Sequence, residues 1–78
     1  MFIEVRLYAT LRRYAPASLA GVFSVEVPMD CTVAELLNMI SIDPTEVHII
    51  MINGVNSKST SALHEGDRLG LFPPVGGG

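Results

Sequence analysis

Aliphatic residues occupy every second position near the start of the chain, at Ile3, Val5 and Leu7. Side chains of a β-strand alternate between its two faces, so this period predicts a strand over residues 2–8 with a buried aliphatic face. Tyr8, at the end of this strand, belongs to the opposite face.

A second strand is predicted over residues 22–27, where Phe23, Val25 and Val27 fall on one side. The stretch between the two strands, residues 9–21, is interrupted by proline and closed by glycine. We expect a loop there, with one helical turn over residues 10–14.

A helix is predicted to begin after Thr32, because its hydroxyl and the carboxylate of Glu35 can form the two halves of a capping box. The apolar residues that follow recur at intervals of three and four, which gives the helix one apolar stripe. They are Val33, Leu36, Leu37 and Ile40. We expect the helix to end within residues 39–41, because a proline follows shortly afterwards.

An apolar run over residues 47–52 predicts a strand that is either buried on both faces or inside the sheet. The Asn-Gly pair at 53–54 favours a tight turn with positive φ, which returns residues 55–56 against the same strand. A final strand is expected over residues 68–72. Its inward-facing residues are Leu69 and Leu71.

The predicted order of elements is strand, strand, helix, strand, short strand, strand. This ββαββ order, with one main helix packed across a mixed sheet, indicates the α+β class and the ubiquitin-like β-grasp fold. The sheet covers its core only if the last strand runs beside the first. We therefore expect one domain over residues 1–75, followed by a flexible C-terminal glycine tail, residues 76–78.

Composition narrows the classes of function. A chain of 78 residues that is 49% hydrophobic and 17% charged can form one core without a disulfide or a structural metal. Its formal net charge of −3 argues against a nucleic-acid partner and favours a partner with a basic docking face. A single cysteine and the lack of a leader pattern predict a cytoplasmic location, and we expect no contact with a membrane.

The last residues combine prolines with glycines. Pro73 and Pro74 fix φ and lack an N–H donor, so they should end the last strand and begin an extended stalk. Gly76, Gly77 and Gly78 have no side chain, so they can pass through a slot that excludes other residues. An ordinary frayed terminus is the alternative interpretation of such a run.

Three segments together carry a family resemblance: residues 52–54 (Ile-Asn-Gly), residues 63–69 (Leu-His-Glu-Gly-Asp-Arg-Leu) and residues 71–78 with their Phe-Pro-Pro-Val stalk. Along nearly its full length the chain resembles the ubiquitin-like sulfur carriers. It is most similar to the small, sulfur-carrying subunit of molybdopterin synthase, since carriers of the thiamine pathway usually lack the paired prolines.

The resemblance implies a chemistry at the terminal carboxylate of Gly78. A carboxylate is a poor electrophile, so an E1-like adenylyltransferase uses ATP to form an acyl-adenylate, and a sulfur donor then leaves a thiocarboxylate. Gly76 and Gly77 give this end access to the large molybdopterin synthase subunit, where sulfur passes to a pterin precursor of the molybdenum or tungsten cofactor. The protein itself is then a non-catalytic carrier without a bound cofactor.

The resemblance also implies where partners dock. Tyr8 and Phe72 end the first and last strands, so we expect an exposed aromatic patch at the root of the tail. The predicted partner-binding residues are Tyr8, Phe72, Pro73, Pro74, Val75 and, at the rim, Arg12. A third position that is apolar in the family's docking patch is Asn56 in this chain, which leaves the identity or affinity of the partner open.

Other reactive side chains have ordinary structural interpretations. Cys31 precedes the helix, where the helix dipole can lower a thiol pKa, but we interpret it as a small, partly buried filler. His48 and His64 have no companions at ligand spacing, so no metal site is predicted.

Three classes of function remain open. The first is a sulfur carrier for molybdenum or tungsten cofactor synthesis, with carriers for thiamine synthesis or tRNA thiolation as its siblings. The second is a ubiquitin-like modifier whose activated end is attached to lysines of other proteins. The third is a non-covalent interaction module, which would keep its activity without Gly77 and Gly78.

Overall fold

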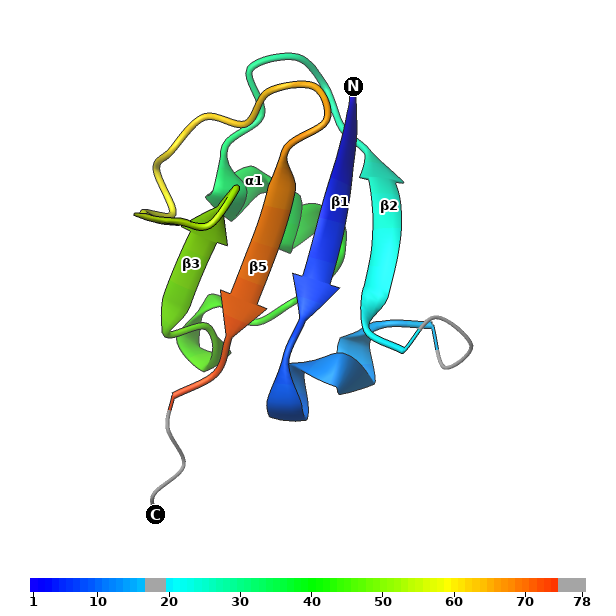
Figure 1. Ribbon diagram of the computed structural model, residues 1–78, viewed down its shortest axis with the longest axis vertical. Helices are drawn as coiled ribbons and strands as arrows, with labels where there is room; N and C mark the ends of the chain where they lie inside the picture. The colour runs from blue at the N-terminus through cyan, green and yellow to red at the C-terminus, as the bar shows by residue number, and fades with distance from the viewer. Residues whose placement is uncertain (17–19, 75–78) are drawn as a thin grey trace.

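The computed structural model describes residues 1–16 and 20–74. Within this part of the chain, five strands form one mixed sheet in the order β2-β1-β5-β3-β4, and an α-helix lies across one face (Figure 1). The strands are β1 (Phe2–Leu7), β2 (Val22–Glu26), β3 (Ile49–Ile52), β4 (Val55–Ser57) and β5 (Arg68–Phe72). The helices are α1 (Val33–Met39) and the 3₁₀ helices η1 (Ala9–Tyr14) and η3 (Pro44–Glu46).

The first and last strands are parallel neighbours in the middle of the sheet. Val5 is paired with Leu69, and Leu7 with Leu71. The remaining strands are added antiparallel on both sides, β2 beside β1 and β3 beside β5. The predicted α+β order and the predicted pairing of the first strand with the last are therefore confirmed.

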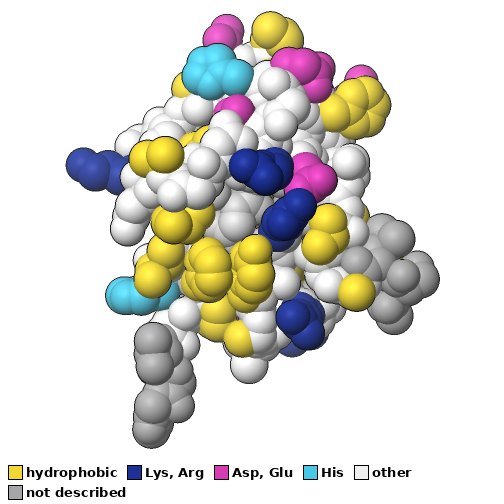
Figure 2. All heavy atoms as spheres, in the orientation of Figure 1, with side chains coloured by type: hydrophobic (Ala, Val, Ile, Leu, Met, Phe, Trp, Pro, Cys, Tyr) yellow, Lys and Arg dark blue, Asp and Glu magenta, His cyan; other side chains and the backbone are white. Residues whose placement is uncertain are grey.

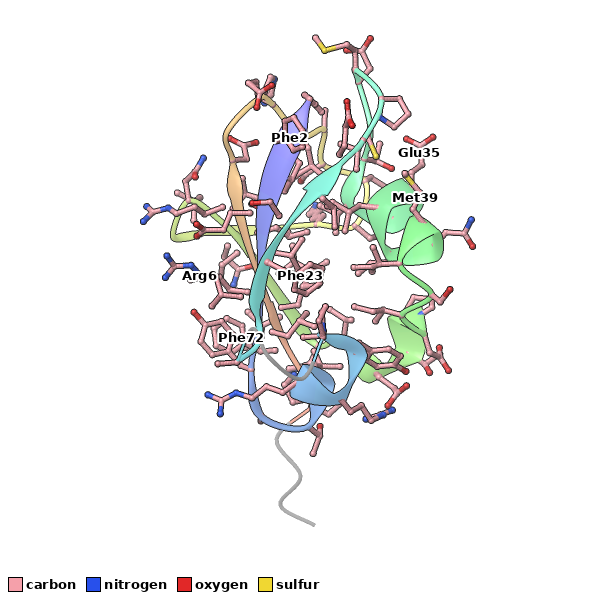
Figure 3. All side chains as sticks on the ribbon, turned by 90° about the vertical axis from the view of Figure 1, so that its right-hand side faces the viewer. Phe2, Arg6, Phe23, Glu35, Met39 and Phe72 are labelled. Carbon is pink, nitrogen blue, oxygen red and sulfur yellow. The ribbon has the colours of Figure 1, made fainter. Side chains whose placement is uncertain are left out.

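The core lies between the sheet and α1. Its strand residues are those that the two-residue period predicted: Ile3, Val5, Leu7, Leu69 and Leu71, all 2% exposed or less. From the helix side, Val33, Leu36 and Leu37 are buried against them. Figure 3 shows Phe23 pointing into the space between sheet and helix, whereas Arg6 and Phe72 lie on the other side of the sheet.

The predicted capping box at the start of α1 is present. The Thr32 hydroxyl accepts a hydrogen bond from the Glu35 amide at 3.2 Å, and the Glu35 carboxylate accepts one from the Thr32 amide at 2.9 Å. Each bond satisfies an amide that the first turn of a helix leaves without a backbone partner. The last residue of α1 is Met39, within the predicted range.

The segment before β3 differs from the prediction. The run 47–52 was expected to be one strand, but β3 begins only at Ile49, because the Asp43 carboxylate accepts from the Thr45 amide at 2.9 Å and caps η3. The strand is interior, between β5 and β4. It is not buried on both faces, since α1 covers only one, and Ile49 is 36% exposed.

The segment after β1 is close to the prediction. The predicted helical turn at residues 10–14 is present, but the 3₁₀ helix η1 begins one residue earlier, at Ala9, with Leu11 fully buried. Leu11 and the half-buried Tyr14 pack towards the core, and two such residues are too few to show by periodicity how far the helix extends.

The predicted Asn-Gly turn is confirmed and is tied to the start of β5. Both Asn53 and Gly54 have positive φ, 53° and 81°. The side-chain Nδ2 of Asn53 donates to the Asp67 carboxylate at 2.8 Å, and the side-chain Oδ1 of Asn53 accepts from the Arg68 backbone amide at 2.9 Å. Asp67, only 8% exposed, also accepts from the His64 amide. These bonds join two polar corners that lie far apart in the sequence.

Candidate functional site

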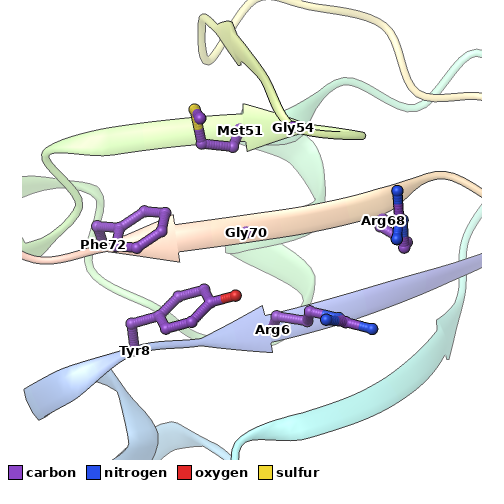
Figure 4. Close-up of a pocket in the computed structure, with 7 residues that line it drawn as sticks. All are labelled: Arg6, Tyr8, Met51, Gly54, Arg68, Gly70 and Phe72. Carbon is purple, nitrogen blue, oxygen red and sulfur yellow. The ribbon is translucent and has the colours of Figure 1, made fainter.

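The site is the face of the sheet that α1 leaves uncovered. Residues next to the buried positions of β1 and β5 must point to this face, because side chains alternate along a strand. They include Arg6 from β1, Tyr8 directly after it, and Arg68, Gly70 and Phe72 from β5. Figure 4 shows the side chains of both strands side by side above the sheet.

Tyr8 and Phe72 form a stacked pair at one end of this face. Their ring centroids are 4.3 Å apart and their planes differ by 2°. Both residues are half-buried. Because β1 and β5 are parallel, both strands end at the same edge of the sheet, where the C-terminal segment of residues 73–78 begins. The predicted proximity of the two aromatic residues is confirmed, and their part in partner binding stays a prediction.

The backbone around the pair is fixed by hydrogen bonds. The Tyr8 amide donates to the Leu71 carbonyl at 3.2 Å, and the His48 amide donates to the Phe72 carbonyl at 2.7 Å. These bonds extend the sheet beyond the last regular pair on either side. The aromatic pair is therefore presented on a rigid platform.

A groove of about 260 Å³ runs along the sheet from this pair. It is lined by Arg6, Tyr8, Met51, Gly54, Arg68, Gly70 and Phe72 (Figure 4). Gly70 lies at its floor, and a Cβ added there would come within 3.5 to 3.8 Å of atoms of Tyr8, Phe72 and Met51. The absence of that side chain keeps the groove open between an aromatic end and a cationic end.

Arg6 is held at the cationic end by a neighbour on its own strand. Its Nε donates to the Glu4 carboxylate at 2.6 Å. This hydrogen bond, more than the accompanying charge attraction, raises the pKa of the Arg6 guanidinium above its ordinary value. Arg6 is thus permanently charged at the groove.

The structure separates the other predicted residues into those near the groove and those away from it. Pro73 is half-buried and Pro74 exposed directly after Phe72. Asn56 is paired with Met51 across β3 and β4, so it shares the open face without lining the groove. Arg12 is exposed in η1 and does not line it either. Val75, Gly76, Gly77 and Gly78 lie outside the described residues.

Five residues that line the groove were not predicted as site residues: Arg6, Met51, Gly54, Arg68 and Gly70. The signal for three of them was available, because Arg6 precedes Tyr8 by two positions, and Arg68 and Gly70 precede Phe72 by four and two. A two-residue period places each on the face of its aromatic residue. Met51 could not be found in this way, since it depends on the register between β3 and β5. Gly54 was predicted only as a turn residue.

Cys31 has the environment of a structural residue. It is 3% exposed, and its Sγ donates to the Thr32 carbonyl at 3.3 Å. Burial, and secondly the charge of Glu35, raise the pKa of the thiol, which opposes formation of the nucleophilic thiolate. The interpretation of Cys31 as a buried filler is confirmed.

Residues 1–16 and 20–74 contain neither a cluster of metal-ligating side chains nor a membrane-spanning helix. No group of three or more potential metal-ligating side chains converges among these residues, and the exposed His64 has only Asp67 near it, at 3.7 Å. None of the helices they form has the length and apolar character needed to span a membrane.

Comparison with known proteins supplies the class of molecule. A five-stranded mixed sheet with one main helix, together with the solved structures that it matches, defines a ubiquitin-like β-grasp protein. Residues 5–78 match the ThiS family, and the chain belongs to this family of ubiquitin-like sulfur carriers. Among the curated proteins, none matches the chain significantly.

Several solved structures share the fold over the whole chain. The crystal structure of SAMP1, small archaeal modifier protein 1, from Haloferax volcanii is 27% identical, with full coverage of both chains and a TM-score of 0.76. The HVO 2177 protein of the same organism is 27% identical, covers 100% of this chain and 87% of its own, and has a TM-score of 0.77.

A third similar structure contains two different subunits. It is the complex of subunits 1 and 2 of the molybdopterin-converting factor from Helicobacter pylori, at 23% identity, full coverage of both chains and a TM-score of 0.63. At this identity the likeness shows the fold alone.

Proposed function

We propose that this protein is the sulfur carrier of a molybdopterin synthase, and that Gly78 carries the sulfur as a thiocarboxylate to a pterin precursor of the molybdenum or tungsten cofactor. The observation that supports the proposal most directly is the stacked Tyr8–Phe72 pair, which lies where the Pro-Pro-Val-Gly-Gly-Gly segment begins. In a family of sulfur carriers, this arrangement puts a docking surface beside the reactive end.

The proposed chemistry has two steps, and partner enzymes catalyse both. A carboxylate oxygen of Gly78 attacks the α-phosphorus of ATP, which forms the acyl-adenylate and releases pyrophosphate. A hydrosulfide ion supplied by the sulfur donor then attacks the glycyl carbonyl carbon. AMP leaves with the electron pair of the broken C–O bond, and loss of the S–H proton leaves the thiocarboxylate. The carrier provides the reacting carboxylate, while an E1-like adenylyltransferase provides the ATP site.

The length of the tail fits this role. Residues 73–78 have a fully extended reach of about 20 Å, because an extended chain spans roughly 3.3 Å per residue. Such a reach crosses the rim of a partner and enters a buried site. Glycines at 76–78 require the narrowest channel of any residue.

The proposed partners are the large molybdopterin synthase subunit and the E1-like adenylyltransferase. The Helicobacter pylori complex supports the first, since a chain of the same fold is assembled there with subunit 2 of its converting factor. We propose that the aromatic pair, Pro73, Pro74 and Val75 contact these partners in turn. Arg12, on the exposed side of η1, is proposed as a contact at the rim.

A second candidate is supported by a different observation. SAMP1, a modifier by its name, is 27% identical to this chain over its full length. A modifier would also need an activated Gly78, but would transfer the glycyl group to a lysine amine instead of accepting sulfur. The two candidates share the first step and differ in the second.

Intact-mass analysis after incubation with the adenylyltransferase, ATP and a sulfur source tests the proposal. We expect a mass gain equal to the replacement of one oxygen by sulfur, localised to Gly78. A chain that lacks Gly77 and Gly78 serves as the control and should show no gain. Isopeptide adducts without a free thiocarboxylate would favour the modifier. An unchanged mass, in a mixture that consumes ATP only when the carrier is present, would overturn the sulfur-carrier proposal.

A further inference from the structure

The groove on the open face has a charge opposite to that of the whole molecule. The chain has eight acidic and five basic residues. Nevertheless, the groove is lined by two arginines, Arg6 and Arg68, and the described residues around it include no acidic lining residue. Figure 2 shows basic side chains in the middle of this face, beside a hydrophobic patch and close to an acidic side chain.

At this end of the groove, one carboxylate lies near two guanidinium groups and pairs with only one of them. Glu4 lies opposite Arg68 in the register of β1 and β5, but its carboxylate bonds Arg6 at 2.6 Å. Arg68 has no ion pair within residues 1–16 and 20–74. A net positive charge therefore remains, and Arg68 is the exposed group that carries it.

The other end of the groove is apolar. Tyr8 and Phe72 are stacked there, Met51 lies on the neighbouring strand, and Gly70 separates them from the arginines (Figure 4). Arg68 lies four residues before Phe72 on β5, about 13 Å along the strand, so a partner surface of that length that covers the aromatic pair also covers Arg68. Covering a guanidinium without supplying a counter-charge is unfavourable, since the group loses water and gains no partner.

We infer that the protein partner that docks on Tyr8 and Phe72 places an aspartate or glutamate side chain in this groove, paired with Arg68. The inference rests on the proposed function, which makes the aromatic pair a docking surface. It adds the chemistry of the partner: an apolar side chain for the aromatic end, next to a carboxylate for the cationic end. Arg6 supports the site by holding Glu4 away from Arg68.

Charge reversal at Arg68 tests the inference. Wild type, Arg68→Glu and Lys58→Glu are compared for binding to the isolated adenylyltransferase and to the isolated large synthase subunit of the same organism. Lys58→Glu is the matched control, because it makes the same charge change at an exposed residue that does not line the groove. We expect Arg68→Glu to raise the Kd for at least one partner about tenfold or more, mainly through slower association, and Lys58→Glu to change it less than about threefold.

Ionic strength separates the charge from other effects. The wild-type association rate should fall as salt is raised, and the rate of Arg68→Glu should not fall, because its groove no longer attracts a carboxylate. The salt dependence of the association rate of Arg68→Gln should lie between those of wild type and Arg68→Glu. Arg68→Gln should keep the wild-type unfolding midpoint, since the contact that Arg68 makes with Asn53 uses its backbone amide. Arg68→Glu should lower the midpoint slightly, because it places a second carboxylate opposite Glu4.

The outcomes distinguish the two proposals. If wild type binds a partner and Arg68→Glu and Arg68→Gln bind it equally well at low salt, the inference is wrong while the proposed function stands. If wild type binds neither partner, the proposed function fails and the inference fails with it. A partner carboxylate whose change to arginine restores the binding of Arg68→Glu would identify the paired residue.

Discussion

Gly21 and Gly54 both have left-handed backbone, but their surroundings differ. Gly21 has a φ of +86°, and a Cβ there would lie 2.8 Å from the Leu7 carbonyl oxygen. Its own carbonyl accepts from the Leu7 amide at 2.8 Å, so the close approach joins the end of β1 to the start of β2. Gly54 has a φ of +81°, and its Cβ would meet nothing within 4 Å.

The two alanine variants should therefore destabilise the protein to different extents. Gly54→Ala adds only the strain of a left-handed alanine, about 1 kcal/mol. Gly21→Ala adds a clash with the backbone and should reduce the free energy of unfolding by about 3 kcal/mol. Urea denaturation at pH 7 measures both. An equal decrease in the free energy of unfolding for both variants would show that the backbone shifts away from the Leu7 carbonyl without loss of stability.

The 3₁₀ helices η1 and η3 are joined by one carboxylate. Glu46, at the end of η3, accepts hydrogen bonds from the Tyr14 hydroxyl and from the Arg13 guanidinium, both in η1. The Arg13 guanidinium also lies over the Tyr14 ring, 4.7 Å from its centroid. The hydrogen bond from Tyr14, followed by that from Arg13, lowers the pKa of Glu46 below its ordinary value of 4.5.

This clamp makes a pH-dependent contribution to stability. Because the folded-state pKa of Glu46 is lowered, the contribution is complete above the ordinary value of 4.5 and is lost as the pH falls through the lowered pKa. The difference in unfolding free energy between wild type and Glu46→Gln should therefore be largest near pH 7 and should shrink towards pH 3. Chemical denaturation across this range measures it, with Glu26→Gln as an exposed control. A difference that stays constant with pH would contradict the clamp.

At the scale of the elements, local sequence patterns were sufficient to predict some helices and strands but not others. The capping box at Thr32 and the alternation in β1 are local patterns, and both elements were predicted close to their observed bounds. In the clamp, Glu46 is separated from Tyr14 by 32 positions in the sequence and from Arg13 by 33, so no local pattern contains these contacts. The late start of β3 follows from η3, a single capped turn whose signal, Asp43 before a proline, competes with the apolar run that follows.

At the scale of the whole molecule, the proposed docking surface is assembled from both ends of the chain. Tyr8 and Phe72 come together only because β1 and β5 are parallel neighbours, which the sequence indicated through the order of its elements. The sequence did not indicate that the groove is positively charged. A net charge of −3 averages over the surface, whereas the charged residues that line this groove are Arg6 and Arg68.

Truncation of the aromatic pair should weaken binding more than folding. Tyr8→Ala or Phe72→Ala should weaken the complex with the large synthase subunit by about 2 kcal/mol, roughly 30-fold in Kd, as for central aromatic residues of interfaces. Phe2→Ala is the matched control, since Phe2 is 55% exposed at the far end of β1. Titration calorimetry gives the Kd values, and thermal unfolding checks the fold. Equal Kd values for Tyr8→Ala and Phe2→Ala would remove the pair from the interface.

The parallel pairing of β1 with β5 also determines when, during synthesis of the chain, the Tyr8–Phe72 pair can form. Residues 4–7 emerge from the ribosome first, but their partners in the middle of the sheet, residues 68–71, emerge near the end. Until then β1 has only β2 beside it, and a lone hairpin is marginally stable in water. The stacked pair therefore cannot form on a nascent chain that stops before β5. If the proposed docking surface is correct, incomplete chains would lack it and would not compete with complete ones for the proposed activating enzyme.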